Sequence, residues 1–319
     1  MTHRFIGIVA AAALAGGIAA ASAHAQAGKF TIAVSLPTAD HGWTGGLLYD
    51  AKQEAALLEH AYPGLTVIVK PSSSAADQAS ALEDLTAGTR PDALVVLPYD
   101  SSQLTGAVRR VKAKGVFITV VDRGLTDPAI QDVYVAGDNP EFGRVAGKYF
   151  VHALGGHGDV VVMRGIPTVV DTQRVTGFQQ AIAGSGVKIM DMQFANWSRD
   201  EGFKVMQDFL AKHGHIDAVW AADDDVAQGA LRAIAQAKRT DIKFVVGGAG
   251  MREVIKGVMD GNSLMPVDVS YPPSMMKTAM DVTAAHLISK AAVRGTFLLS
   301  TVLITKQNAA EYYDPNSPF

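Results

Sequence analysis

Thr-Val-Val-Asp-Arg-Gly, at residues 119–124, places a run of β-branched residues directly before an Asp–Arg pair and a glycine. A buried parallel strand ends in this way when its carboxyl edge carries polar groups toward a ligand. Asp122 and Arg123 are therefore candidate binding residues. From this stretch alone, the alternative is that the two residues form only a solvent-exposed ion pair at the end of the strand.

The same pattern recurs along the chain. An apolar strand, polar residues at its tip and then a helical segment are predicted at residues 32–40, 93–99, 160–165, 218–224 and 243–250. Strands that alternate with helices predict an α/β fold with parallel sheets wound on both faces. With 319 residues, 48% of them hydrophobic, the chain is long enough for two such lobes.

Composition excludes several classes of protein. The net charge of −3 provides no basic surface for nucleic acid or an anionic membrane. The chain has no cysteine, and so no disulfide framework, no thiolate nucleophile and no cysteine-based zinc site.

The N-terminal residues predict a targeting segment. Arg4 precedes a small apolar run at residues 5–21, and small-x-small patterns follow at residues 23–27. This arrangement is typical of a cleavable secretory signal peptide. The run is short and rich in Ala and Gly, which disfavours a membrane span. We therefore expect residues 1–27 to be a signal peptide and the mature protein to reside in the periplasm.

Motifs of enzymes and metal sites are missing from the sequence. Asp223, Asp224 and Asp225 stand in a row, but a calcium loop needs alternating ligands, a glycine bend and a distal Glu. No His-x-x-x-His pair, Gly-x-Ser-x-Gly elbow or phosphate-binding loop occurs, and Gly-Gly-Ala-Gly at 247–250 lacks the dinucleotide spacing. We expect no catalytic activity, no metal and no cofactor.

The strand tips share a chemical character. They carry aromatic rings, carboxylates and guanidinium groups, namely Trp43, Trp197, Asp122, Asp171, Asp223, Arg123 and Arg174. A sugar or polyol suits this set, because flat rings cover its C–H surface and charged groups bind its hydroxyls. Each aspartate alone is as well explained as a helix N-cap. Asp171 and Arg174 are placed in a loop, residues 169–174, ahead of a helix at 175–184.

Four segments resemble the type I periplasmic sugar-binding proteins of bacterial ABC importers, with a layout nearest to the ribose-binding proteins. They are Val-Val-Asp-Arg at 120–123, Val-Ala-Gly-Asp-Asn at 135–139, Arg-Val-Thr-Gly-Phe-Gln-Gln-Ala at 174–181 and Ala-Ala-Asp-Asp-Asp-Val-Ala-Gln-Gly-Ala at 221–230. The order and spacing of these segments match the family from end to end. The resemblance implies two doubly wound parallel-sheet lobes joined by a three-stranded hinge.

The resemblance also implies how the chain is divided. Residues 28–136 with 271–299 would form the N-terminal lobe, and residues 137–270 with 300–319 the C-terminal lobe. The last strand, predicted at 301–306, would belong to the second lobe.

The ligand-binding residues implied by the resemblance and by the strand-tip pattern are His41, Trp43, Asp122, Arg123, Asp171, Arg174, Trp197, Asp223 and Ser270. The chain departs from the family at three places. Ala249 stands where an Asp is usual, His41 replaces a common Asn, and Ser270 lies where a Gln or Asn is frequent. One acceptor is therefore missing, and Asp171 is expected to be an extra one.

The function implied is capture of a sugar or sugar alcohol between the lobes and its delivery to an ABC transporter permease. A monomer is expected, with a chemoreceptor as a second partner and no nucleic acid. A sensor that feeds a chemoreceptor or kinase would have the same sequence features. A repressor effector domain shares the fold but needs a helix-turn-helix before Gly28, where the signal segment stands instead.

Overall fold

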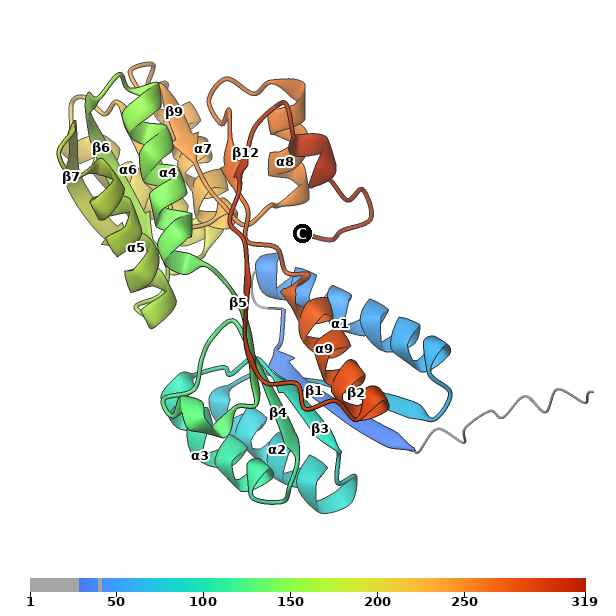
Figure 1. Ribbon diagram of the computed structural model, residues 1–319. Coiled ribbons are helices and arrows are strands. Elements are labelled where there is room, and N and C mark those ends of the chain that lie inside the picture. The colour runs from blue at the N-terminus through green and yellow to red at the C-terminus, as the bar shows by residue number, and fades with distance from the viewer. Residues whose placement is uncertain (1–28, 40–41) are drawn as a thin grey trace, which may run out of the picture.

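The computed structural model describes residues 29–39 and 42–319, which form two lobes linked by three segments of chain (Figure 1). The predicted signal peptide and His41 lie outside the described residues. No helix in the described ranges combines the length and apolar character needed to cross a membrane.

The first lobe is built on a six-stranded parallel sheet in the order β11-β5-β4-β3-β1-β2. The strands are β1 Phe30–Pro37, β2 Leu65–Ser72, β3 Ala93–Val96, β4 Phe117–Val121, β5 Val133–Gly137 and β11 Gly295–Leu299. The helices are α1 Gly42–Ala61, α2 Ala75–Gly88, α3 Ser101–Lys112 and α9 Met275–Ser289, with a short 3-10 turn at Pro128–Ile130.

Side-chain alternation along the strands explains the layering of this lobe. Ile32 of β1 packs in the core that includes Leu47 of α1 and Met280 of α9. The next residue, Ala33, packs instead with Leu104 of α3. Since successive side chains of a strand point to opposite faces, one strand supplies both helical layers.

The second lobe has a four-stranded parallel sheet in the order β7-β6-β8-β9. Its strands are β6 His157–Arg164, β7 Gly186–Phe194, β8 Ala218–Ala221 and β9 Phe244–Val246. Helices α4 Asn139–Ala153 and α5 Val169–Ile182 cover one face, α6 Arg199–Lys212 and α7 Asp224–Ala237 the other, and α8 Arg252–Asp260 follows β9 (Figure 1). The strands β10 Asp268–Val269 and β12 Leu303–Ile304 pair antiparallel beside it, and a 3-10 turn, Ala309–Glu311, follows.

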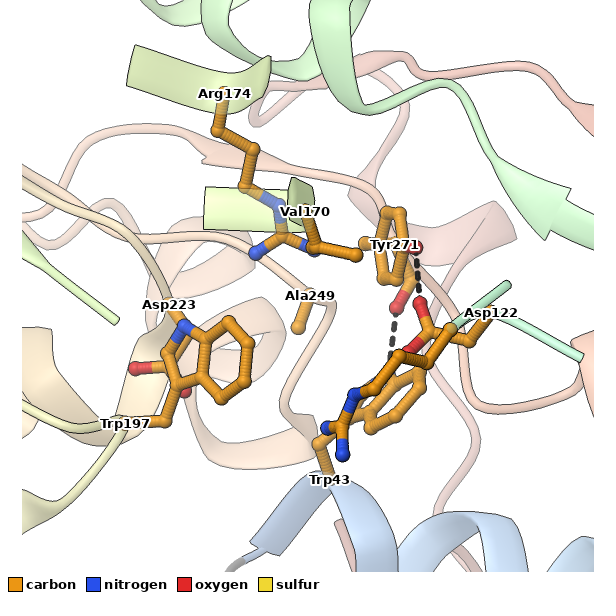
Figure 2. Close-up of a pocket in the computed structure, with 9 residues that line it drawn as sticks. Trp43, Asp122, Val170, Arg174, Trp197, Asp223, Ala249 and Tyr271 are labelled. Atoms are coloured by element: carbon orange, nitrogen blue, oxygen red, sulfur yellow. Dashed lines mark hydrogen bonds between the residues drawn. The ribbon is translucent and has the colours of Figure 1, made fainter. Parts of the chain in front are cut away.

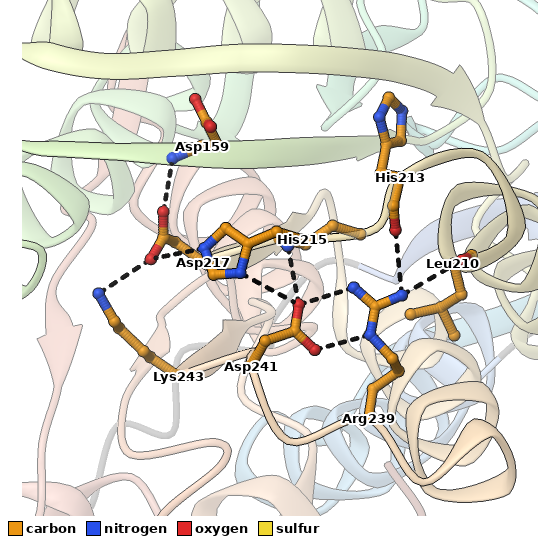
Figure 3. A network of polar contacts seen from close by, with 9 residues as sticks. Asp159, Leu210, His213, His215, Asp217, Arg239, Asp241 and Lys243 are labelled. Atoms are coloured by element: carbon orange, nitrogen blue, oxygen red, sulfur yellow. Dashed lines mark hydrogen bonds and ion pairs between the residues drawn. The ribbon is translucent and has the colours of Figure 1, made fainter.

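A polar network holds the amino ends of these strands, at the edge of the sheet opposite the carboxyl ends (Figure 3). Arg239 donates from Nε and Nη2 to Asp241, each at 2.7 Å, and this pairing holds the pKa of Asp241 well below its usual value. Lys243 pairs with Asp217 at 2.9 Å, and Asp217 also accepts from the backbone N–H of Asp159 at 2.8 Å. Charge-assisted bonds of this kind fix the loops between strands.

The three linking segments are hydrogen-bonded to one another. The Ser270 hydroxyl accepts from the backbone N–H of Val302 at 2.8 Å, and the backbone N–H of Ser270 donates back to the Val302 carbonyl at 2.9 Å. The Thr301 hydroxyl donates to the carbonyl of Asp138 at 3.2 Å. The bonds between Ser270 and Val302 join the second linking segment to the third, and the bond from Thr301 to Asp138 joins the third to the first.

Two predicted elements differ from the structure. The helix expected at residues 175–184 begins at Val169, because the Thr168 side chain accepts from the backbone N–H of Asp171 and caps it six residues earlier. The strand expected at residues 301–306 is only Leu303–Ile304. Strand β11 was not predicted, since it is an edge strand that is mostly exposed and lacks the buried pattern of the others.

Candidate functional site

A pocket lies between the lobes, where the carboxyl ends of both sheets face each other (Figure 2). Its lining residues come from both lobes and from the link between them: Trp43, Asp122, Arg123, Val170, Arg174, Trp197, Asp223, Ala249 and Tyr271. Six of the nine residues predicted from the sequence are brought together here: Trp43, Asp122, Arg123, Arg174, Trp197 and Asp223.

Asp122 and Arg123 form the wall that comes from the end of β4. Asp122 is only 4% exposed and accepts a hydrogen bond from the hydroxyl of Tyr271, which argues against the exposed ion pair. Arg123 donates from Nη1 to the carbonyls of Pro98 and Tyr99. Its buried Nε has no partner among the described residues. An unpaired buried donor is costly, so a ligand oxygen would stabilise it.

Arg174 forms part of the opposite wall, from the second turn of α5. Its guanidinium carbon lies over the rings of Phe142 and Tyr271, at 4.2 and 4.3 Å from their centroids. Nε donates to Asn139 at 2.9 Å and Nη1 to the carbonyl of Ala222 at 2.8 Å. These contacts orient the group and leave Nη2 without a bond to any described residue, so this nitrogen can donate to a ligand.

Asp223 combines the helix-cap role with a place in the pocket. One carboxyl oxygen caps α7 by accepting from the backbone N–H of Val226 at 2.9 Å. Burial raises the pKa of Asp223 to about 8, and the neighbouring Asp225 and Asp224 raise it further while Arg174 opposes the shift. At neutral pH the carboxyl group is therefore mostly protonated and can donate to a ligand as well as accept.

Two tryptophans supply apolar faces. Trp43, at the start of α1, donates from its ring nitrogen to the carbonyl of Tyr271 at 2.9 Å, and the two rings lie 5.8 Å apart. Trp197, in the loop after β7, lies directly against Gly165. A Cβ at position 165 would come within 1.9 Å of the Trp197 ring nitrogen, so only glycine allows this ring position.

Unusual backbone conformations gather at the pocket. Asp122, Trp197 and Ala249 line it and have φ values of 55°, 52° and 120°. Other described non-glycine residues with positive φ include Lys238 and Lys290, which are helix C-caps. Strained residues away from such caps persist where surrounding structure holds them, and they cluster at functional sites.

The structure places two predicted residues away from the pocket lining. Asp171 is fully buried, pairs with Arg164, and accepts from the backbone N–H of Gly165 at 2.8 Å. It therefore holds the end of β6 against α5. Ser270 bonds Val302 within the linking segments.

Tyr271 and Val170 line the pocket but were not among the predicted residues; Ala249 was considered only as a departure from the family. The Tyr271 hydroxyl bonds Asp122 and also accepts from Asn139 at 3.1 Å, so the ring connects the two lobes. Burial and the nearby Asp122 raise the pKa of Tyr271 well above its usual value. The only sequence signal was its place beside the predicted crossing at Ser270.

The three consecutive aspartates, Asp223, Asp224 and Asp225, have different roles. Asp224 accepts from the backbone N–H groups of Gly248 and Met251, each at 2.8 Å, and so holds the loop that carries Ala249. Asp225 accepts from the backbone N–H of Gly42 in the other lobe at 3.1 Å. Within the described residues, no group of three or more His, Cys, Asp or Glu side chains could hold a metal ion.

Comparison with known proteins identifies the family. Residues 32–291 match the periplasmic binding protein domain. The ribose import binding protein RbsB of Escherichia coli is 30% identical over 302 residues, which are 94% of this chain and 97% of that protein.

Two solved structures are also similar. An ABC transporter solute-binding protein of Mycobacterium smegmatis with bound glycerol has a TM-score of 0.80 at 27% identity, over 91% of this chain and 99% of that one. The myo-inositol-binding protein of Caulobacter, bound to myo-inositol, has a TM-score of 0.78 at 26% identity, over 89% and 95%. With its two parallel-sheet lobes, the chain belongs to the periplasmic binding protein family and, within it, to the type I sugar-binding proteins of bacterial ABC importers.

Proposed function

We propose that this protein binds an uncharged sugar or sugar alcohol between its lobes and delivers it to the permease of an ABC importer. The observation that carries the proposal is the pocket, where Trp43 and Trp197 provide apolar faces beside the donors and acceptors of Arg123, Arg174 and Asp223. Polyols need this combination of flat apolar surface and charge-assisted hydrogen bonds.

The polar groups of the pocket support the same ligand class. The two guanidinium groups face the carboxylate of Asp122 and the mostly protonated Asp223. These groups supply both donors and acceptors for the hydroxyls of a ligand.

The family location is the periplasm, and a signal peptide at residues 1–27 would deliver the chain there. The relatives are binding proteins, and we assign no catalytic step to this chain. We take residues 28–136 with 271–299 and residues 137–270 with 300–319 as lobes that move about the three linking segments. A monomeric state and a chemoreceptor partner stay predictions.

A ligand screen tests the proposal directly. Thermal-shift measurements over pentoses, hexoses, inositols and short polyols should identify at least one stabilising compound, because a ligand that binds only the folded state raises the melting temperature. Titration calorimetry of that compound then gives its affinity. If no sugar or polyol stabilises the protein or binds in calorimetry, the proposed function is wrong.

Arg123→Ala tests the position of the site. Removing a buried charged donor should weaken binding of the best ligand by about 2–4 kcal/mol. Arg109→Ala is the matched control, since the Arg109 side chain is exposed and pairs with Asp127 at the surface. If Arg123→Ala binds within about threefold of the parent in calorimetry, a change below about 0.7 kcal/mol, the ligand does not contact this wall.

A further inference from the structure

One wall of the pocket is formed by the loop after β9, residues 247–250, which reads Gly-Gly-Ala-Gly. Packing explains the first two glycines. A Cβ at Gly247 would come within 2.4 Å of an Asp224 oxygen, and a Cβ at Gly248 within 2.1 Å of the Phe142 ring. The φ of 87° at Gly250 favours glycine as well.

Ala249 breaks this pattern. Its φ of 120° is a conformation that favours glycine, yet the position carries a methyl group. The methyl group points into the pocket (Figure 2), where Ala249 is one of the lining residues. Strained backbone conformations cluster at functional sites. The strain at Ala249 therefore points to a role for its methyl group in ligand binding.

The loop holds this methyl group in place. The backbone N–H of Ala249 donates to the carbonyl of Val269 at 2.8 Å. Its neighbours are held by carboxylates, since Gly248 donates to Asp224 at 2.8 Å and Gly250 to Asp268 at 3.1 Å. The loop is thus tied on both sides of Ala249, and the methyl group cannot turn out of the pocket without breaking buried hydrogen bonds.

A second lining residue is apolar as well. Val170, in the first turn of α5, has only carbon atoms in its side chain. The groups that bind hydroxyls lie elsewhere on the lining, at Arg123, Arg174 and Asp223. A ligand that carries hydroxyls on every carbon would bury one against a methyl group, without a hydrogen-bond partner.

We propose that the pocket selects a deoxy sugar or deoxy polyol, whose methyl or methylene group packs against the methyl groups of Ala249 and Val170. This inference rests on the proposed function and narrows its ligand class. The apolar group of the ligand would replace the hydroxyl that the Ala249 wall cannot satisfy.

Pairs of compounds that differ by one oxygen test the inference. The pairs are L-fucose with L-galactose, L-rhamnose with L-mannose, D-fucose with D-galactose, and fucitol with galactitol. In titration calorimetry, the deoxy member of the pair that binds best should bind about tenfold more tightly, as expected when a rival must bury an unpaired hydroxyl.

The variant Ala249→Gly removes the methyl group and relieves the backbone, so it should fold at least as well as the parent. We expect it to reduce the preference for the deoxy compound about fivefold or more, because the apolar contact is lost and space opens for a hydroxyl and its water. Ala183→Gly, at the exposed end of α5, is the matched control and should keep the parental preference.

The possible outcomes separate this inference from the function on which it rests. If sugars bind but the deoxy member is not preferred in any pair, or the preference survives Ala249→Gly, the inference is overturned and the proposed function stands. If neither these pairs nor the broader panel of sugars and polyols binds, both are overturned.

Discussion

At the scale of single residues, Asp223 shows how burial changes the chemistry of a side chain. The residue is 6% exposed and is followed in the sequence by two more aspartates, Asp224 and Asp225. Burial is the main cause that raises its pKa to about 8. The folded protein therefore holds a proton that an Asp in the unfolded chain releases near pH 4.

Stability should consequently depend on pH through this group. Between about pH 4 and pH 8 the folded state binds more protons, so the contribution of Asp223 to the free energy of unfolding falls as pH rises, by about 1.4 kcal/mol per pH unit. Asp223→Asn keeps an oxygen that caps Val226 and removes the titration. Denaturant unfolding of the ligand-free proteins at pH 5, 6.5 and 8 measures the difference.

The parent should lose stability relative to Asp223→Asn as the pH increases. Other buried acids, such as Asp268 with a pKa raised to about 7 chiefly by burial, are present in both proteins. The charge of Asp223 adds a smaller part to the Asp268 shift, so the contribution of Asp268 cancels only in part. Parallel stability curves for the two proteins would mean that Asp223 is ionised throughout this range.

At the scale of elements, the contact between α4 and α5 positions one wall of the pocket. A Cβ at Gly143 of α4 would come within 1.8 Å of the carbonyl oxygen of Arg174, and a Cβ at Gly177 of α5 within 2.1 Å of the carbonyl oxygen of Pro140. The helices therefore touch backbone to backbone. Since α5 carries Val170 and Arg174, this contact sets how far they reach into the pocket.

Gly143→Ala should separate the two helices, because the clash is with backbone rather than with a flexible side chain. We expect the free energy of unfolding to fall by about 2–3 kcal/mol. Gly106→Ala in α3 is the control: the nearest atom to its Cβ would be 3.7 Å away, so removing a helical glycine should stabilise by about 0.5–1 kcal/mol. Equal stabilities in urea unfolding would contradict the packing argument.

At the scale of the whole molecule, the C-terminal tail connects the lobes beside the pocket. The chain ends between α8 and α1 (Figure 1). Arg252 of α8 donates to the carbonyl of Ser317 at 2.6 Å, while the Phe319 ring is 4% exposed and lies where a Cβ at Gly42 of α1 would be 2.9 Å from it. This contact and the bond from Gly42 to Asp225 form only while the lobes are together.

Phe319→Ala should therefore favour separation of the lobes. We expect a larger radius of gyration of the ligand-free protein by small-angle X-ray scattering. We also expect about tenfold weaker ligand binding, because fewer molecules have the lobes in contact. Tyr312→Ala, which changes a more exposed residue of the same tail, should leave both unchanged. If Phe319→Ala matches the parent in both measurements, the tail does not hold the lobes together.

Local patterns in the sequence were enough to predict the two parallel-sheet lobes and to choose six residues that line the pocket, among them Asp122 and Trp197. Strand periodicity and polar strand tips are local signals, and the carboxyl ends of parallel strands meet at one edge. The resemblance to the family supplied the order of the links between lobes.

Only the tertiary structure decided what individual side chains do. Asp171 was predicted to be a ligand acceptor but is bonded by Arg164 and Gly165. Tyr271 stood out in the sequence only by its place beside the predicted crossing at Ser270, but it bonds Asp122 across the link between lobes. The pKa of Asp223 and the strained backbone of Ala249 were equally invisible in the sequence. Hydrogen-bond partners, burial and backbone angles depend on residues far apart in the chain, so a pattern of neighbours cannot specify them.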